Sequence, residues 1–201
     1  MDSITKLLFW VANSLLIPDI ILLLILFVRS LILLGSFFNQ FMTKRANDAL
    51  LKSRIEQCDT PGELVALASV VPATDNSLFT RYLRRMLDES QSGNRQDYLL
   101  SEFEIKADKD LSTCRILSKI GPVLGLVGTL IAMSPALVGL SSGDVSGMAY
   151  NMQVVFATTV VGLLISSIGL VTLVYKQRWY ASELNLLEYV SSTFRGNNKP
   201  L

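Results

Sequence analysis

Three apolar stretches with almost no charge constrain this chain more than any other feature of its sequence. Residues 20–41 contain one charged side chain, Arg29, and residues 121–140 and 152–175 contain none. A helix of roughly 20 residues crosses the hydrocarbon core of a bilayer, so each stretch is long enough to cross it once. The mean hydropathy of +0.42 is also too high for a typical soluble domain. The sequence therefore predicts an all-α polytopic membrane protein with three transmembrane helices.

The positions of lysine and arginine predict how these helices are oriented. Basic side chains follow the first stretch at Lys44, precede the second at Lys119 and follow the third at Lys176, whereas the loop 141–151 carries only Asp144. Basic flanks remain on the cytoplasmic side of a membrane. We therefore expect a multi-pass protein of the cell (inner) membrane, with its N-terminus outside and its C-terminus in the cytoplasm. No cleavable signal peptide is expected, because the N-terminal apolar residues run on into the first stretch.

This orientation divides the chain into alternating membrane and aqueous segments. In order, they are an outside N-terminal segment (1–19), transmembrane helix 1 (20–42), a cytoplasmic helical region (43–119), transmembrane helix 2 (120–140), a short outer loop (141–151), transmembrane helix 3 (152–175), and a cytoplasmic C-terminal helix and tail (176–201).

The cytoplasmic region has the composition of a solvated helical segment. Its twelve basic and twelve acidic residues balance, which gives no indication of nucleic-acid binding. Helices are expected at about 44–57, 61–71, 78–89 and from about 97 onward, and Thr60 and Pro61 of the TPGE motif have the character of a helix start. Apolar stripes predict that the second and third spans extend as long helices into this region. Their members are Leu100, Phe103, Ala107, Cys114, Leu117, Leu184, Leu187, Val190 and Phe194. Either internal packing or subunit contact would explain them.

Residues that usually carry out catalysis or bind metal are scarce. The chain has no histidine, and its two cysteines, Cys58 and Cys114, lie far apart in the sequence, in a region expected to be cytoplasmic. That spacing matches neither a zinc site nor a disulfide framework. No GxxxxGK[ST] phosphate loop is present. We therefore expect no enzymatic activity, no cofactor and no metal.

Small residues recur at helical spacing in the second and third apolar stretches. Because lipid gives helices little hydrophobic reason to associate, close backbone contact between small residues often holds them together. Either a hairpin within one chain or contact between subunits would use these faces. Two prolines in the second stretch should also bend the helix and free main-chain carbonyls. The packing residues are Gly121, Gly125, Gly128, Gly162, Ser166 and Gly169, and the bending residues are Pro122 and Pro135.

Four hydroxyl side chains lie within the same two stretches: Thr129, Ser134, Thr158 and Thr159. A polar atom at this depth is unfavourable unless it bonds to a neighbour or faces water. Such hydroxyls also bond to their own helix backbone, so by themselves they leave a pore and a simple helix equally open. Adjacent residues differ by about 100° around a helix, which turns Thr158 and Thr159 in different directions.

The two stretches resemble a known family. The run GPVLGLVGTL, followed after a short loop by FATTVVGLLISSIG, is similar to the two pore helices of the MotA/TolQ/ExbB proton-channel family. The resemblance covers roughly residues 100–190, and three spans with a large segment after the first fit the ExbB/TolQ-like branch. By motif position, Thr129 and Thr159 match the pore threonines. With Ser134 and Thr158 they form the ion pathway expected from this resemblance. One difference is that Val154, beside Gln153, occupies the place where ExbB and TolQ usually have a glutamate.

The resemblance implies a function and partners. Family members form a homo-oligomeric ring, typically a pentamer, in the lipid bilayer around single-span ExbD/TolR/MotB-like subunits that carry a membrane aspartate. Ion flow down the proton motive force is thereby coupled to mechanical work or energised transport. Spans two and three contain no Asp, Glu, His or Lys, so the titrating group is expected on the partner. A structural membrane scaffold and a small secondary transporter are the alternatives. Arg29 either snorkels toward a headgroup or contacts a subunit or lipid.

Overall fold

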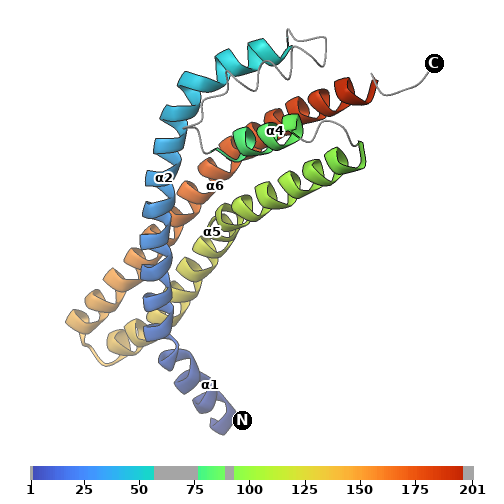
Figure 1. Cartoon of the computed structure of the whole chain (residues 1–201). Helices are drawn as coiled ribbons and strands as arrows, with labels where there is room; N and C mark the ends of the chain where they lie inside the picture. Colours follow the sequence, from blue (N-terminus) through green and yellow to red (C-terminus); the bar gives the residue numbers. More distant parts are fainter. Residues whose placement is uncertain (1, 57–76, 89–92, 197–201) are drawn as a thin grey trace. The chain divides into compact units, whose positions relative to one another are not determined.

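The computed structural model describes residues 2–56, 77–88 and 93–196, and every regular element in them is a helix. Figure 1 shows these elements. They are α1 (Asp2–Ser14), α2 (Leu16–Glu56), α4 (Leu78–Asp88), α5 (Gly93–Ser141) and α6 (Val145–Gly196). The predicted all-α fold is confirmed. The helix predicted at 61–71, with its start at Thr60, lies outside the described residues.

Three helices are long and apolar enough to cross a membrane, as predicted. Their candidate spans lie within Leu16–Met42, Arg95–Ser141 and Val145–Phe194. The 49 residues of α5 correspond to roughly 75 Å of helix, more than twice the thickness of a bilayer's hydrocarbon core. The same holds for the 52 residues of α6. Both helices therefore continue well beyond the membrane, which confirms the extended second and third spans.

The helix that contains the first span differs from the sequence prediction at both ends. It begins at Leu16 rather than Ile20, with Pro18 in its first turn. Proline is tolerated there because the first amide groups of a helix have no acceptor within it. At the other end, the helix expected at 44–57 is not separate, because α2 continues without interruption to Glu56. No glycine or proline follows Gly35 in this helix, so nothing in the sequence breaks it.

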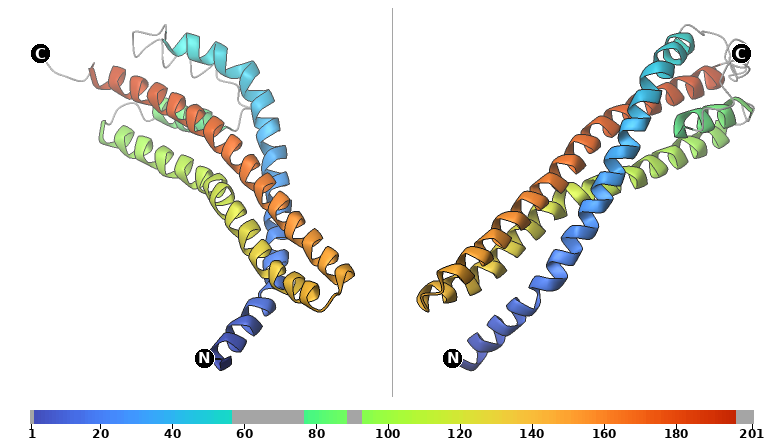
Figure 2. Two further views of the ribbon diagram at one scale, coloured as in Figure 1. Left: turned by 180° about the vertical axis from the view of Figure 1, so that it is seen from behind. Right: turned by 90° about the vertical axis from the view of Figure 1, so that its left-hand side faces the viewer.

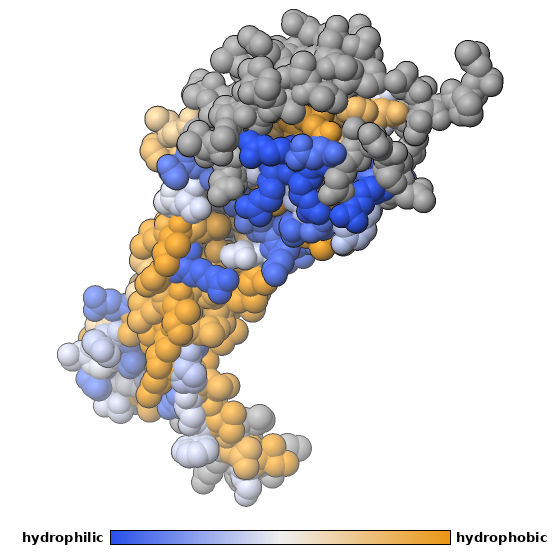
Figure 3. Space-filling model, in the orientation of Figure 1, coloured by the Kyte–Doolittle hydropathy of each residue, from blue (hydrophilic) through white to orange (hydrophobic). Residues whose placement is uncertain are grey.

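The chain forms two compact units, and each long helix contributes to both. The first, which we call the membrane unit, contains residues 1–37 and 113–173, and the second, the head unit, contains residues 38–112 and 174–201. Large apolar side chains such as Leu126, Leu130 and Leu163 are exposed on the membrane unit. Figure 3 shows such residues as an extensive apolar surface. A surface of this kind is suited to contact with lipid.

Within the membrane unit, α5 and α6 form an antiparallel hairpin, and the views in Figure 2 show the two helices side by side. Gly143 makes the turn with a φ of 78°, a conformation that costs glycine little. Asp144 then caps α6, since its Oδ1 accepts a 2.8 Å hydrogen bond from the Gly147 amide. Leu23 of α2 packs against Leu117 of α5 and Ile165 of α6. The first span therefore contacts the hairpin formed by the other two.

The head unit has its own apolar core between α4, α5 and α6, to which Ile55 of α2 also belongs. Phe103 and Ala107 of α5 are buried in it together with Leu187 and Val190 of α6. Their burial confirms internal packing for these members of the two apolar stripes. An ion pair joins α5 and α6 in this unit. The Nζ atom of Lys176, which is only 3% exposed, lies 2.7 Å from Oδ2 of the more exposed Asp110.

Candidate functional site

The backbones of α5 and α6 approach one another closely at glycines. A Cβ atom at Gly121 would lie 2.7 Å from the main-chain oxygen of Gly162, and one at Gly162 would lie 2.6 Å from that of Gly121. A Cβ at Gly169 would lie 2.7 Å from the Ser118 amide nitrogen. Contacts this short leave no room for a side chain, so the hairpin requires glycine at these positions. The structure thus brings the small-residue faces of the two helices together within one chain.

The contact between α5 and α6 also compensates for Pro122, one of two prolines inside α5. Pro122 has no amide hydrogen, so the carbonyl of Ser118, four residues earlier, receives no hydrogen bond from within its own helix. The hydroxyl of Ser166 on α6 donates a 2.8 Å hydrogen bond to that carbonyl. The second proline, Pro135, also lies inside α5. The carbonyl freed by Pro122 is therefore satisfied inside the hairpin.

The three threonines of the predicted ion pathway each donate a hydrogen bond to their own helix. Thr129 Oγ1 donates to the Leu126 carbonyl at 2.7 Å, and Thr159 Oγ1 donates to Val155 at 3.0 Å. The Thr158 hydroxyl lies 3.1 and 3.0 Å from the carbonyls of Val154 and Val155. A hydroxyl that donates one hydrogen bond still has two acceptor lone pairs. These oxygens therefore remain able to accept a hydrogen bond from water or from an acid.

The hydroxyl residues differ in how accessible they are. Thr158 is buried in the hairpin, whereas Thr129, Ser134 and Thr159 are half-buried. Thr158 and Thr159 thus face different surroundings, as their position around the helix predicts. Thr158 places its Cβ and methyl group where a side chain at Gly128 would have to lie.

One residue that the sequence prediction placed outside the membrane stands inside this unit. Asp19, in the first turn of α2, is 7% exposed, and neither of its carboxylate oxygens has a hydrogen-bond partner among the described residues. A Cβ at Gly128 would lie 2.8 Å from Asp19 Oδ2 and 3.0 Å from the Cβ of Thr158. Side chains of α2 and α6 therefore converge on a glycine of α5. The apolar residues before Asp19, from Leu15 to Pro18, were the available sign that the span begins earlier.

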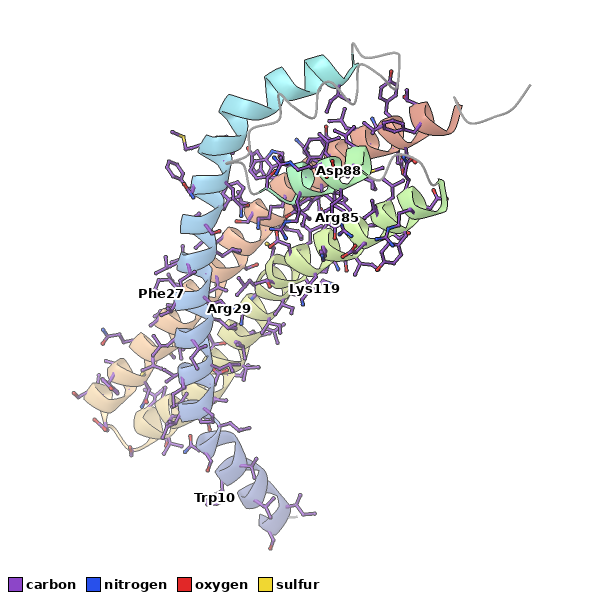
Figure 4. All side chains as sticks on the ribbon, viewed as in Figure 1. Trp10, Phe27, Arg29, Arg85, Asp88 and Lys119 are labelled. Carbon is purple, nitrogen blue, oxygen red and sulfur yellow. The ribbon has the colours of Figure 1, made fainter. Side chains whose placement is uncertain are left out.

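Arg29 lies on the outer surface of α2 in the membrane unit and is exposed (Figure 4). It follows Asp19 by ten residues, or roughly 15 Å along a helix, which is too far for the two side chains to pair within one chain. Its exposed neighbours include Val28 and Ile32. Snorkelling and a subunit or lipid contact of Arg29 both stay predictions.

Side chains that could hold a metal ion are not grouped in the part of the chain that the structure describes. No three His, Cys, Asp or Glu residues come together there. Cys114, expected to be cytoplasmic, is a buried cysteine outside any disulfide and belongs to the membrane unit. Where α2 meets the α5–α6 hairpin, the available polar groups are therefore hydroxyls, main-chain carbonyls and the carboxyl group of Asp19.

Comparison with known proteins agrees with this arrangement. The sequence model of the MotA/TolQ/ExbB proton channel family matches residues 70–188, which include α4, α5 and most of α6. That range is more than half of the 201 residues. Neither a search of curated proteins nor a search of solved structures found a match. On the strength of the family match, the chain belongs to the MotA/TolQ/ExbB proton channel family.

Proposed function

We propose that this chain is the ring-forming subunit of a proton-driven membrane motor. Five copies would surround a single-span ExbD/TolR/MotB-like partner that carries a membrane aspartate, and proton flow would drive mechanical work or energised transport. The observation that carries the proposal is the family match over the α5–α6 hairpin. Membership of the family implies a proton channel of ion-driven motors, and the hairpin contains the hydroxyl side chains expected of its pore.

In this mechanism, the chain's own residues provide polar positions along an apolar wall. Thr129 and Thr159 are half-buried, and each has acceptor capacity beyond the bond that it donates. They would accept hydrogen bonds from pore water or from the partner's protonated aspartic acid, with Ser134 and Thr158 extending the polar path. Protonation of the partner removes a charge that is costly in an apolar site, which would allow the partner to move past the ring.

The glycine contacts support a rigid wall for such a moving partner. The α5–α6 hairpin closes without side chains between its backbones at Gly121 and Gly162, and Ser166 links it to Ser118. A hairpin locked in this way presents a constant surface while the partner steps. The exposed apolar residues of the membrane unit would then contact lipid or neighbouring copies.

We propose that the ring lies in the cell (inner) membrane with the N-terminus outside and the head unit in the cytoplasm. The basic flanks at Arg115 and Lys176 support this orientation, since positive side chains favour the cytoplasmic side. In this arrangement the residues before α2 precede the first span, and 141–151 form the outer loop. Asp19, in the first turn of α2, is buried against the hairpin, which supports a span that starts at Leu16 and includes Asp19.

The test is to express the full chain with the single-span protein encoded beside it, if that protein's span contains an aspartate. The mass of the purified complex should correspond to five copies of this chain with its partner. In vesicles with an imposed pH gradient, a pH-sensitive dye should report proton flux that requires both proteins. A complex that assembles but conducts no protons would contradict the proposal and support a structural scaffold. Substrate-dependent flux by this chain alone would support a secondary transporter.

A further inference from the structure

The membrane unit contains a carboxyl group of its own, and the proposed motor mechanism does not use it. Asp19 is buried opposite Gly128 of α5, and Thr158 of α6 lies against the same glycine. Both of its oxygens are shielded from solvent and neither has a hydrogen-bond partner in the described structure. An isolated ionised carboxylate in such surroundings is strongly unfavourable, whereas the neutral acid is far less so.

The stretches of α5 and α6 beside Asp19 carry no basic residue that could compensate its charge. Residues 120–143 of the α5 side and 145–174 of α6 contain no Lys, Arg or His, and no further acid. The nearest basic residues along the three helices are Arg29 on α2, Lys119 on α5 and Lys176 on α6. Lys119 precedes Gly128 by nine residues, or roughly 14 Å of helix. Arg29 is exposed on the outer surface of α2, roughly 15 Å along the helix from Asp19.

A bound metal ion does not fit this position either. Hard cations take about six or more oxygen ligands. The described residues contain no cluster of three metal-binding side chains, and the Thr158 hydroxyl already bonds to its own helix. A proton needs only one carboxylate oxygen. The site therefore suits a proton better than a metal ion.

We propose that Asp19 is a proton-binding site of this chain, located where α2 meets the α5–α6 hairpin opposite Gly128. On uptake, a proton from water forms an O–H bond with one carboxylate oxygen, and on release that bond breaks and the proton passes to water or to another acceptor. The role of this site in the motor rests on the proposed proton-channel function, to which it adds a second proton-binding group. It gives each copy in a ring one titratable group, in addition to the aspartate expected on the partner.

Gly128 is what makes room for this carboxyl group. An alanine there would place its Cβ 2.8 Å from Asp19 Oδ2, a distance that non-bonded carbon and oxygen atoms do not tolerate. Gly125, one turn earlier, provides a matched comparison, since its Cβ would contact the Thr158 carbonyl oxygen at 3.2 Å and has no close contact with Asp19. Gly128→Ala should therefore disturb the proton site, while Gly125→Ala disturbs only the contact between helices.

The experiment measures the protonation of Asp19 directly in the full chain reconstituted in lipid vesicles. Dicyclohexylcarbodiimide is an apolar reagent that adds to protonated carboxyl groups, and mass spectrometry of peptides locates the adduct. We expect Asp19 to be modified at neutral pH, with a rate that falls about tenfold per pH unit once the pH exceeds the midpoint of the site. Asp144, the exposed acid in the α5–α6 turn, should remain unmodified under the same conditions. No reaction at Asp19 from about pH 5 to about pH 9 would overturn the proposal.

Variants and added ions distinguish a proton site from an ion pair and from a sodium site. Gly128→Ala should change the rate or the pH midpoint of the reaction at Asp19, and Gly125→Ala should leave both near the parent values. If Asp19 reacts only after Arg29→Leu, it is instead an ionised partner of an arginine from a neighbouring copy, and the proposal fails. If added sodium at constant pH protects Asp19 from the carbodiimide, the site binds a sodium ion and not a proton, and the proposal also fails.

The reaction needs neither the partner nor ion flux, so it fails or succeeds independently of the motor mechanism. Modification of Asp19 that depends on pH, in a complex that conducts no protons, would retain the site and contradict the proposed function. Flux that persists in Asp19→Asn, together with an unreactive parent Asp19, would retain the function and remove the site.

Discussion

The hydroxyl of Ser166 donates a 2.8 Å hydrogen bond to the main-chain oxygen of Ser118, the carbonyl that Pro122 leaves without a donor in its own helix. Proline inside a membrane helix is unfavourable unless another group satisfies the carbonyl that it frees. Here a side chain of the neighbouring helix does so. The proline and the serine therefore form one feature, which locks α5 against α6.

We predict that Ser166→Ala destabilises the chain by about 0.5–2 kcal/mol, because it leaves a carbonyl unsatisfied in an apolar contact. In a Pro122→Ala background the cost should be smaller, since alanine has an amide hydrogen that it can donate to the Ser118 carbonyl. Unfolding of the full chain in mixed detergent micelles would measure both values.

Ser167→Ala is the matched control for the Ser166→Ala variant in both backgrounds. The Ser167 hydroxyl is exposed and bonds to the Leu163 carbonyl of its own helix at 2.8 Å. Its removal should change the free energy of unfolding by less than about 0.5 kcal/mol. Equal costs for Ser166→Ala in both backgrounds would contradict the proposed link to Pro122.

A second prediction concerns the buried lysine of the head unit. Asp110 accepts hydrogen bonds from Lys176 Nζ at 2.7 Å and from the Tyr180 hydroxyl at 2.8 Å. Asp110→Ala leaves an almost fully buried ammonium group without this partner and should cost about 1–3 kcal/mol of stability. Tyr180→Phe removes only a neutral donor and should cost about 1 kcal/mol or less. A melting temperature unchanged by Asp110→Ala would show that the pair adds nothing to the stability of the head unit.

The stability of the head unit should also depend on pH through Glu102. The hydrogen bond from Lys106, at 2.8 Å, together with nearby Arg85, holds the pKa of Glu102 below its usual value of 4.5. A lowered pKa in the folded state contributes stability above pH 4.5, and this contribution is lost as the pH falls through the folded-state value. Acid unfolding of the parent should therefore be steeper below that pH than that of Glu102→Gln.

Glu104→Gln provides the comparison for the pH experiment, because Glu104 is exposed on the same helix. The Glu104→Gln variant should unfold in acid as steeply as the parent. The same pair acts in the opposite sense at high pH. The hydrogen bond to Glu102 raises the pKa of Lys106 above 10.5, so its contribution is present below that pH and is lost as the pH rises through the folded-state value. If Glu102→Gln and the parent unfold identically in acid, this ion pair has no role in stability.

Much of the fold follows from local sequence patterns, and the exceptions have physical reasons. Apolar stretches of bilayer length identify the three spans, and glycines at helical spacing identify the closest contact between α5 and α6. The burial of Asp19 could not be predicted from local sequence patterns, because it depends on where α2 begins and on which helix lies opposite. Helix ends are the least certain part of a sequence prediction. The prediction began transmembrane helix 1 at Ile20 and so assigned Asp19 to the outside segment, whereas the helix α2 begins at Leu16 and includes Asp19.

The assignment of threonines to a pore, by contrast, rests on family resemblance and not on geometry. Thr129, Thr158 and Thr159 all bond to their own helix. Neither this pattern nor half-burial distinguishes a pore hydroxyl from an ordinary one. A direct measurement of conduction is therefore needed to assign their roles. Thr129→Val should reduce proton flux, because valine keeps the shape of threonine but cannot bond to pore water or to an acid.

Proton flux through Thr159→Val is the most direct test of the account. The variant would be assembled with its single-span partner in vesicles and compared with the parent under the same pH gradient. Loss of one hydrogen bond along the path corresponds to about 1.4 kcal/mol, so we expect flux to fall about tenfold or more while the ring stays intact. Thr158→Val should reduce flux less, because Thr158 is buried inside the hairpin. Parental flux in an assembled Thr159→Val complex, or a larger loss in Thr158→Val, would contradict the account.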